Sequence, residues 1–352
     1  MSVAVLHMPG TALPTMRWEQ SRTAQEQAKL WGLAGTELAR WERIVRGAGV
    51  ERRCAVVEPG EAMPLTTAQR MQRFAQHAPP LAHAAARDAL ANAGVRADEV
   101  TDLVVVSCTG FRSPGVGLEL AVSLGLDAGV RHSQIGFMGC FGGVCGARAA
   151  AAVAGADPQA VVLLVCIELC SLHMRADRTP QNLVACALFA DGAAAAVVTQ
   201  RPRAQGAVAR LDLGRSRVLP GTGDAMTWTI TDAGFAMTLA REVPGALEGC
   251  IGGVVAGDAA LVVHPGGAGI VDAVEAGTRA LAPAPDARSY EASRAVLREH
   301  GNMSSGSVFF VLRELLARGV PVGAPGYRTR MVAFGPGLTV DSVGLLPLAG
   351  VP

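Results

Sequence analysis

Short apolar runs rich in valine and leucine alternate with helical patterns along this chain, and this alternation restricts its possible folds more than any other feature. The runs "TDLVVVSCTG" (101–110) and "AVVLLVCIEL" (160–169) predict buried strands, because β-branched residues are frequent in both. Helices are predicted over 66–94, 115–125 and 140–155, with Gly94 as a stop signal. This alternation favours an α/β fold with a mostly parallel sheet covered on both faces.

The second half of the chain repeats the same order of elements. A strand and glycine turn, "DAALVVHPGG" (258–267), precede helices over 268–281 and 306–319 and two strands within 329–348. In the first half we also expect one helix over 21–47, a strand that runs into Gly139, and a turn and strand over 187–200. A chain of 352 residues exceeds one ordinary core, so we expect two similar halves, 1–205 and 206–352, divided in the polar "QRPRAQG".

The composition argues against several classes of protein. A formal net charge of +1 offers no single-sign surplus for nucleic acid or an anionic membrane. The N-terminus lacks a basic segment followed by a long apolar core, and no uninterrupted apolar run reaches the ~18 residues of a membrane span. We therefore expect a soluble, cytoplasmic protein with reduced cysteines. No metal site is predicted, because Cys166 and Cys170 lack a second ligand pair.

One cysteine stands among glycines in "GFMGCFGG" (136–143), at the predicted start of a helix. Backbone N–H groups and the helix dipole at this position favour a negative charge, so we expect the pKa of Cys140 to be lowered and its thiolate to be accessible. Gly139, Gly142 and Gly143 would leave room for an acyl group and for close helix packing. Taken alone, however, Cys140 could equally be a buried core residue.

Two later residues make a nucleophile the better hypothesis. His264 ends an apolar strand and precedes "PGG", at the carboxyl end of a strand, where α/β folds bind their ligands. Asn302 lies in "HGNMSSGSV", a polar turn that opens a helix. Each could be structural on its own, as a strand end or a helix N-cap. Together with Cys140 they form a Cys, His and Asn set on turns between elements.

The motifs "GFMGCFGG", "LFADGAAAA", "VVHPGGAGIVDAVE", "GNMSSGSVFFVL" and "AFGPGLTVDSV" resemble the signature blocks of type III polyketide synthases, the chalcone and stilbene synthase superfamily. The resemblance extends from about residue 40 to residue 346, in the order found in that family. It implies a thiolase fold, in which two similar αβαβα halves form a five-layered architecture, and a homodimer.

The resemblance also implies a mechanism. Cys140 would carry the starter acyl group as a thioester, with His264 as the imidazolium partner of its thiolate. Asn302 and His264 would stabilise the enolate that forms when malonyl-CoA loses carbon dioxide. This decarboxylative Claisen condensation, repeated and followed by cyclisation, gives a pyrone, resorcinol or phloroglucinol. Its substrates would be an acyl-CoA starter and malonyl-CoA, and no cofactor or metal would be needed.

Further positions of the family map onto the reaction cavity. Phe189 matches a gatekeeper phenylalanine, whereas the second gatekeeper appears as Met237. Met237 and the short Ser113 favour an aliphatic, long-chain starter, and Trp228 opposes this by filling space. Asp191 is expected to be structural. The remaining cavity positions are Cys108, His173 and Ser304.

Arg40 and Arg43 match two basic positions that the family uses for the phosphates of coenzyme A. The third position is Gly47 in this chain, with Arg46 adjacent. The guanidinium group is well suited to phosphate, although a solvated helix face would look the same. Gly266 and Gly269 match the loop that passes close to the pantetheine arm.

Three alternatives stay open at this point. A ketoacyl synthase III-like enzyme would perform one condensation with an acyl carrier protein. A papain-like cysteine hydrolase also has Cys, His and Asn in this chain order, but its local cysteine motif is absent from "GCFGGVCG". A non-catalytic scaffold of the same fold is the third.

Overall fold

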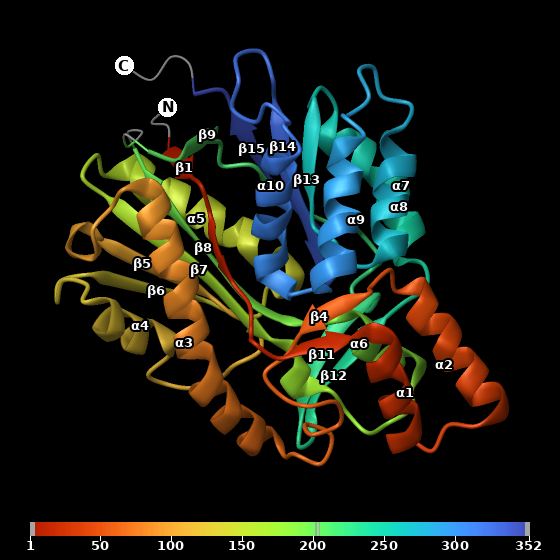
Figure 1. Cartoon of the computed structure of the whole chain (residues 1–352). Coiled ribbons are helices and arrows are strands. Elements are labelled where there is room, and N and C mark those ends of the chain that lie inside the picture. The colour runs from red at the N-terminus through yellow and green to blue at the C-terminus, as the bar shows by residue number, and fades with distance from the viewer. Residues whose placement is uncertain (1–3, 201–202, 204, 349–352) are drawn as a thin grey trace.

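The computed structural model describes residues 4–200, 203 and 205–348, and a single mixed sheet runs through this part of the molecule (Figure 1). The predicted boundary near residue 205 falls in a segment of which residues 201, 202 and 204 lie outside the described residues. Two strands of the sheet lie off its main path: β10 (Arg215–Val218) pairs with β15, and β2 (Gly10–Ala12) pairs with β8. The main path follows the order β13 (Ala260–Val263), β14 (Thr329–Gly335), β15 (Thr339–Leu346), β9 (Ala207–Leu211), β1 (Ala4–His7), β8 (Asp191–Thr199), β7 (Val161–Leu169), β5 (Asp102–Val106) and β6 (Arg131–Ile135).

The prediction of a mostly parallel sheet is wrong. Among the described strands of this sheet, only the pairs β5–β6, β5–β7 and β13–β14 are parallel, and the other pairs are antiparallel. Continuous apolar runs indicate that a strand is buried on both faces, but they carry no information about the direction of its neighbour. Burial on both faces is confirmed for β7 and β8, in which every residue is buried.

The helices form layers on and between the two halves of the sheet, and the five-layered architecture is confirmed. Alternate residues of each strand face different helices. Val162 and Leu164 of β7 share a core with α5 (Gly142–Ala156) and α10 (Ser307–Ala317), whereas Leu163 and Val165 face α3 (Thr67–Ala93) and α4 (Val116–Leu124). On the far side of the second half, Val332 packs with α7 (Val243–Val255) and α8 (Ala268–Thr278). The pair α5 and α10 is thus the middle layer, and α9 (Arg288–His300) packs against α10 and β13.

Most predicted helices are present, with one exception. The helix predicted over 66–94 is α3, which starts with a capping box between Thr66 and Gln69 and ends at Gly94 in the left-handed region. The single helix predicted over 21–47 is two helices, α1 (Gln20–Leu30) and α2 (Gly35–Gly47). Gly32 and Gly35 have φ of 61° and 52°, so the chain turns between them.

Smaller elements gather at one end of the molecule, where α1, α2 and α6 (Pro180–Leu188) lie beside two antiparallel strand pairs (Figure 1). These pairs are β3 (Arg17–Glu19) with β4 (Arg52–Cys54), and β11 (Met226–Thr231) with β12 (Gly234–Leu239). Short 3₁₀ turns complete the chain: η1 (Ala97–Glu99), η2 (Gly139–Phe141), η3 (Cys170–His173) and η4 (Ser304–Gly306).

One stretch of the described chain, Gly139–Ala156, is long and apolar enough to cross a membrane by composition. It comprises η2 and α5, and 56% of it is buried inside the fold. Its apolar side chains pack against strands of both halves of the sheet, so its composition is that of a central core helix.

Candidate active site

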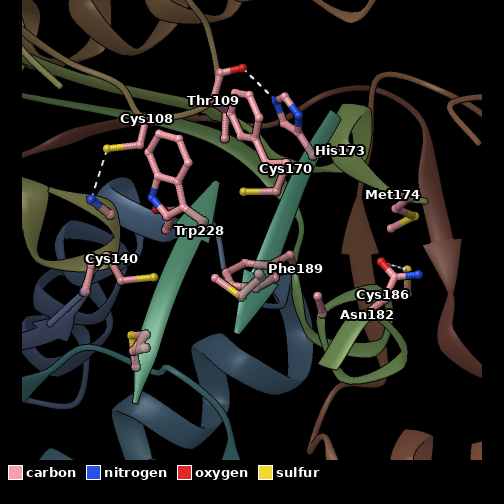
Figure 2. Close-up of a pocket in the computed structure, with 17 residues that line it drawn as sticks. Cys108, Thr109, Cys140, Cys170, His173, Met174, Asn182, Cys186, Phe189 and Trp228 are labelled. Atoms are coloured by element: carbon pink, nitrogen blue, oxygen red, sulfur yellow. Dashed lines mark hydrogen bonds between the residues drawn. The ribbon is translucent and has the colours of Figure 1, made fainter. Parts of the chain in front are cut away.

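A largely apolar cavity of about 100 Å³ lies where η2, η3, η4, α6 and the β11–β12 hairpin meet. Figure 2 shows cysteine, aromatic and histidine side chains from these elements converging on it. The predicted residues Cys140, Phe189, Met237, Cys108, His173, Trp228 and Ser304 all line this cavity. The other lining residues are Thr109, Gly139, Cys170, Met174, Asn182, Ala185, Cys186, Met226, Phe235 and Pro336.

The structure brings Cys140 and Asn302 together, although 162 positions separate them in the chain. The Asn302 Nδ2 group donates to Cys140 Sγ at 3.9 Å and to the Gly266 carbonyl at 3.5 Å. Its Oδ1 accepts the Ser304 backbone N–H at 2.8 Å. The turn that carries Gly266 also carries His264, whose carbonyl accepts the Gly266 N–H at 2.9 Å. The predicted Cys, His and Asn residues therefore belong to one connected group of turns.

The backbone holds Asn302 in place on both sides. Its N–H donates to the Leu188 carbonyl and its carbonyl accepts the Ala190 N–H, each at 2.9 Å. These bonds form an isolated bridge between Phe189 and Asn302, so the predicted gatekeeper and the predicted catalytic amide are fixed to each other. Ser304 follows with φ of 48°, a left-handed conformation that is costly for a residue with a side chain. Strain of this kind is typical of functional sites.

The pKa of Cys140 differs from the expectation. Cys140 lies in η2, just before α5, and burial raises the pKa of its thiol to about 11. Hydrogen bonds from the Ser304 and Asn302 side chains stabilise the thiolate and lower this pKa, whereas the negative charge of Glu168 raises it, as burial does. The prediction of a lowered pKa is therefore wrong for the protein without substrate, because desolvation of the thiolate outweighs the helix dipole.

His264 is 1% exposed, and neither of its ring nitrogens has a hydrogen-bond partner among the described residues. Burial lowers its pKa to about 3, so the imidazole is neutral. A buried polar group without a partner destabilises the fold, and a catalytic role is one reason for such a group to be retained. A neutral imidazole can accept the proton of a nearby thiol, and the resulting imidazolium and thiolate would stabilise each other.

The glycines around Cys140 allow the two halves to pack closely. A Cβ on Gly143 would lie 2.2 Å from the Ser305 carbonyl oxygen, and one on Gly139 would lie 2.7 Å from Pro336 Cδ. Gly335 is similarly constrained, since a Cβ there would meet Phe141 at 2.3 Å. Close packing was predicted for Gly139 and Gly143. The absence of side chains at these glycines allows η2 to lie against η4.

A stack of rings forms one wall of the cavity. His173 and Phe235 stack with centroids 3.8 Å apart, and Phe235 and Trp228 stack at 4.9 Å. The His173 Nε2 lies 2.8 Å from the Thr109 carbonyl (Figure 2), and burial lowers the pKa of His173 to about 4. Because that carbonyl accepts the Nε2 proton, the neutral ring has one fixed orientation.

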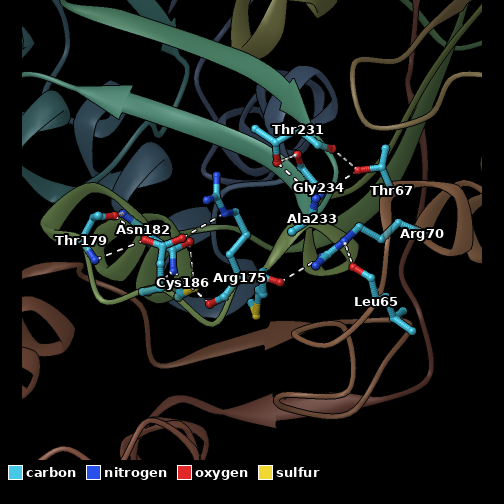
Figure 3. A network of polar contacts seen from close by, with 12 residues as sticks. Leu65, Thr67, Arg70, Arg175, Thr179, Asn182, Cys186, Thr231, Ala233 and Gly234 are labelled. Carbon is cyan, nitrogen blue, oxygen red and sulfur yellow. Dashed lines mark hydrogen bonds and ion pairs between the residues drawn. The ribbon is translucent and has the colours of Figure 1, made fainter.

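The hairpin that carries Trp228 and Phe235 is tied to the start of α3 (Figure 3). The Gly234 N–H donates to Thr67 Oγ1 at 2.8 Å, and the Thr67 hydroxyl donates to the Thr231 carbonyl. Beneath the hairpin, the fully buried Arg70 donates to the carbonyls of Leu65, Leu172 and Met174. The ring wall is thus held by polar contacts from three segments.

Ser113, which the family resemblance assigns to the cavity of the partner in a dimer, does not line the cavity of its own chain. It is exposed in the loop before α4. Phe111, two residues earlier, contacts the ring wall, with its ring centroid 5.5 Å from that of Phe235.

Two of the four predicted coenzyme A residues line a second groove of about 340 Å³. Gly266 and Gly269 line it, together with Gly47 at the end of α2. Arg40 and Arg43 are exposed on α2 and do not line the groove itself. Nothing in this arrangement opposes a coenzyme A site, which stays a prediction.

Two buried charged residues near the cavity escaped the sequence analysis. Glu168 accepts hydrogen bonds from the Thr109 and Ser305 hydroxyls at 2.7 and 2.6 Å and from the Cys108 N–H, and burial raises its pKa to about 7. The sequence did contain a signal for Glu168, because it is the one charged residue in the otherwise apolar run "AVVLLVCIEL". Arg53 donates to the Phe189 carbonyl at 2.7 Å, and no sequence pattern marked it.

Asp191 has the contacts of a structural residue, as expected. It is fully buried and accepts hydrogen bonds from the backbone N–H groups of Val56 and Ser171, at 2.8 and 2.7 Å, and from the Ser171 hydroxyl. Burial raises its pKa to about 6. These bonds tie the start of β8 to the loop after β4.

Residues 54–202 match the N-terminal domain of chalcone and stilbene synthases, and residues 210–349 match the C-terminal domain of the same family. The chain therefore belongs to the chalcone and stilbene synthase family, the type III polyketide synthases, and is an enzyme of the acyltransferase type. Its fold is the thiolase fold predicted from the resemblance.

Relatives from distant organisms agree with this assignment. The α-pyrone synthesis polyketide synthase-like protein Pks18 of Mycobacterium tuberculosis is 30% identical over 97% of this chain and 91% of its own. Type III polyketide synthase C of Arabidopsis thaliana is 31% identical over 70% of this chain and 68% of its own. The C-terminal type III polyketide synthase domain of Steely1, a type I/III hybrid from Dictyostelium, superposes with a TM-score of 0.89 at 26% identity, covering 99% and 100% of the two chains.

Proposed function

We propose that this enzyme transfers an acyl group from an acyl-CoA starter to Cys140 and extends it with malonyl-CoA by decarboxylative Claisen condensation. His264 accepts the proton of the Cys140 thiol, and the thiolate attacks the starter thioester. The departing coenzyme A thiolate then takes this proton from the His264 imidazolium. Malonyl-CoA then loses carbon dioxide, and its enolate carbon attacks the Cys140 thioester and releases the thiolate. Because decarboxylation supplies the carbon nucleophile, we propose no cofactor or metal beyond these thioesters.

The orientation of the Asn302 amide carries this proposal. Its Oδ1 is committed to the Ser304 N–H, so its Nδ2 hydrogens must face Cys140. Both contacts of Nδ2 are long, at 3.9 and 3.5 Å, and can be exchanged for a shorter bond to an oxyanion. A donor that is fixed in direction but weakly occupied suits the enolate oxygen of a malonyl thioester near Cys140.

The size of the cavity bears on the starter. Its free volume of about 100 Å³ is below the ~300–1,000 Å³ that is usual for small-molecule sites. The stacked rings of Trp228, Phe235 and His173 make up one wall of this cavity. We therefore propose a short aliphatic starter in place of the long-chain starter that Met237 and Ser113 suggested. Few extensions fit such a cavity, which favours release as a pyrone by lactonisation.

We also propose a homodimer that forms along β6. This strand is at the edge of the sheet in the described part of the chain, and four of its five residues are exposed. Val122 of α4 and Phe137 after β6 are 77% and 61% exposed, and Leu118 is 49% exposed. An edge strand flanked by exposed apolar side chains is a typical surface for a second copy. Light scattering after size exclusion would test it, and a monomer at micromolar concentration would refute it.

The reaction is tested by incubating the purified protein with malonyl-CoA and acetyl-, hexanoyl-, lauroyl- and benzoyl-CoA, and identifying products by mass. We expect triketide or tetraketide pyrones from acetyl- or hexanoyl-CoA, and a starter adduct on Cys140 in the intact protein. Cys140→Ser should abolish condensation, whereas the matched variant Cys250→Ser, in α7, should not. Equal condensation by Cys140→Ser would exclude the proposed nucleophile.

A parallel incubation distinguishes the ketoacyl synthase alternative. Supplying the same acyl groups on an acyl carrier protein should give slower turnover than the CoA thioesters, with the same products. A single condensation product, formed only from carrier-bound substrates, would contradict the proposed iterative use of malonyl-CoA.

A further inference from the structure

The second groove leads from the surface to the catalytic turns. Its walls are the end of α2, α6, the loop after β12 and the turn after His264. At its inner end, Gly266 contacts Asn302 through its carbonyl, and Leu188 precedes the predicted gatekeeper Phe189. The inner end of the groove is therefore joined to the turn that carries Asn302, the partner of Cys140.

The walls are suited to a slender, uncharged chain. Gly47, Gly266, Gly267 and Gly269 supply no side chains, and the other lining residues, apart from one, are apolar. A pantetheine arm is such a chain, and in coenzyme A it is followed by a diphosphate and a ribose phosphate. A protein that binds it would place cations at the outer end of the groove.

Two cations lie on the expected side. Arg40 and Arg43 are one helical turn apart on α2, on the same face as Ile44 and Gly47, which line the groove. Gly47 leaves this face without a third charge. Arg46 does not supply it, because it lines a different groove and pairs with Glu42 at 3.9 Å.

The exception among the lining residues is Arg241. It follows β12 in the wall that does not include α2, and its side chain is exposed. Within residues 4–200, 203 and 205–348 it makes no hydrogen bond or ion pair. The neighbouring Glu242 is not among the residues that line the groove. Arg241 is thus a free cation on a wall of the groove that α2 does not form.

We propose that Arg241 is the third phosphate-binding residue for coenzyme A thioesters and acts from the opposite wall in place of the missing charge at Gly47. This inference rests on the proposed use of coenzyme A thioesters. It makes Arg241 a binding residue rather than a catalytic one, so its loss should affect affinity and leave the condensation step unchanged.

The test is calorimetric binding of coenzyme A and of pantetheine, which lacks the nucleotide phosphates. Arg241→Gln should weaken coenzyme A binding about three- to tenfold, the scale of one partly exposed charged contact, and leave pantetheine binding unchanged. Added salt should weaken coenzyme A binding less in Arg241→Gln than in the wild type. In kinetics, KM for malonyl-CoA should rise with kcat unchanged, while turnover of malonyl-N-acetylcysteamine should stay the same.

The matched control is Arg279→Gln, which removes an exposed arginine just beyond the C-terminal end of α8, away from the groove. The proposal would be overturned if both variants weakened coenzyme A binding equally, or if Arg241→Gln weakened pantetheine binding as much as coenzyme A binding. Failure of the proposed function looks different: the wild type would bind coenzyme A but form no polyketide. No binding of coenzyme A by the wild type would overturn the role of Arg241.

Discussion

The Asn302 amide donates to the sulfur of Cys140 across 3.9 Å, although the two residues come from different halves of the chain. The two 3₁₀ turns that carry Cys140 and Ser304, η2 and η4, pack directly on each other. The catalytic geometry therefore depends on how the halves meet, and a variant can damage the site without touching substrate.

Replacing the donor itself should separate two steps of the reaction. Asn302→Ala removes an amide donor that the structure directs at Cys140, so we expect malonyl-CoA decarboxylation to fall about 10²- to 10³-fold. Loading of the starter needs the thiol and the imidazole, and it should fall less than tenfold. Carbon dioxide release and intact-protein mass measure the two steps. Equal loss of both would show that Asn302 acts mainly on the structure of the site.

The contact between the halves can be tested at Gly143. A Cβ there would meet the Ser305 carbonyl at 2.2 Å and the Val308 side chain at 3.2 Å, so Gly143→Ala must push η4 away. We expect a loss of about 1–3 kcal/mol in the free energy of unfolding and a larger proportional loss of turnover. Gly249→Ala in α7, where nothing lies within 4 Å, should gain about 0.5–1 kcal/mol. Urea unfolding measures the stability of both variants, and turnover assays measure their activity. A Gly143→Ala variant with unchanged stability and turnover would contradict the close packing of Gly143 on η4.

Much of the fold could be predicted from local pattern. The apolar runs at 101–110 and 160–169 contain the strands β5 and β7, and the capped pattern at 66–94 is α3. Strand direction could not be predicted, because Val162 and Val198 pair antiparallel through contacts that no local sequence records. The break between α1 and α2 depends on Gly32 and Gly35, which helical periodicity alone did not mark.

The residues of the site could be predicted from motifs, but the pKa values of Cys140 and His264 could not. Cys140 and Asn302 meet because η2 and η4 do, which the family resemblance implied and composition did not. Burial raises the pKa of Cys140 and lowers that of His264, and burial is a property of the whole fold. For the same reason Arg53, which supports Phe189 from β4, left no signal in its own segment.

The buried thiols should make the protein sensitive to alkaline pH. Burial raises the pKa of Cys186 to about 12 and that of Cys166 well above its usual value, whereas both ionise near pH 9 in the unfolded chain. Their stabilising contribution is complete below pH 9 and is lost as the pH rises toward the folded values. Each fully buried thiol should remove about 1.4 kcal/mol per pH unit above pH 9.

Urea midpoints between pH 7.5 and 10.5 measure this loss. The wild type should be stable to about pH 8.5 and then fall steeply. Cys186→Ala should start lower, because it leaves a small cavity, but should fall by about 1.4 kcal/mol less per pH unit. Parallel curves for the two proteins would mean that Cys186 does not ionise on unfolding.

The ring wall should set the length of the starter. Trp228 stacks on Phe235 at 4.9 Å and on Phe137 at 6.0 Å, and it lines the cavity next to Met237. Trp228→Gly should open space for several methylene groups and raise kcat/KM for lauroyl-CoA at least about tenfold relative to acetyl-CoA. Ile230→Ala, which truncates an exposed side chain of the same hairpin, should leave the chain-length preference unchanged. If Trp228→Gly lowered activity equally for all starters, the indole would be supporting the hairpin rather than limiting the substrate, and Met237 would be the next residue to exchange.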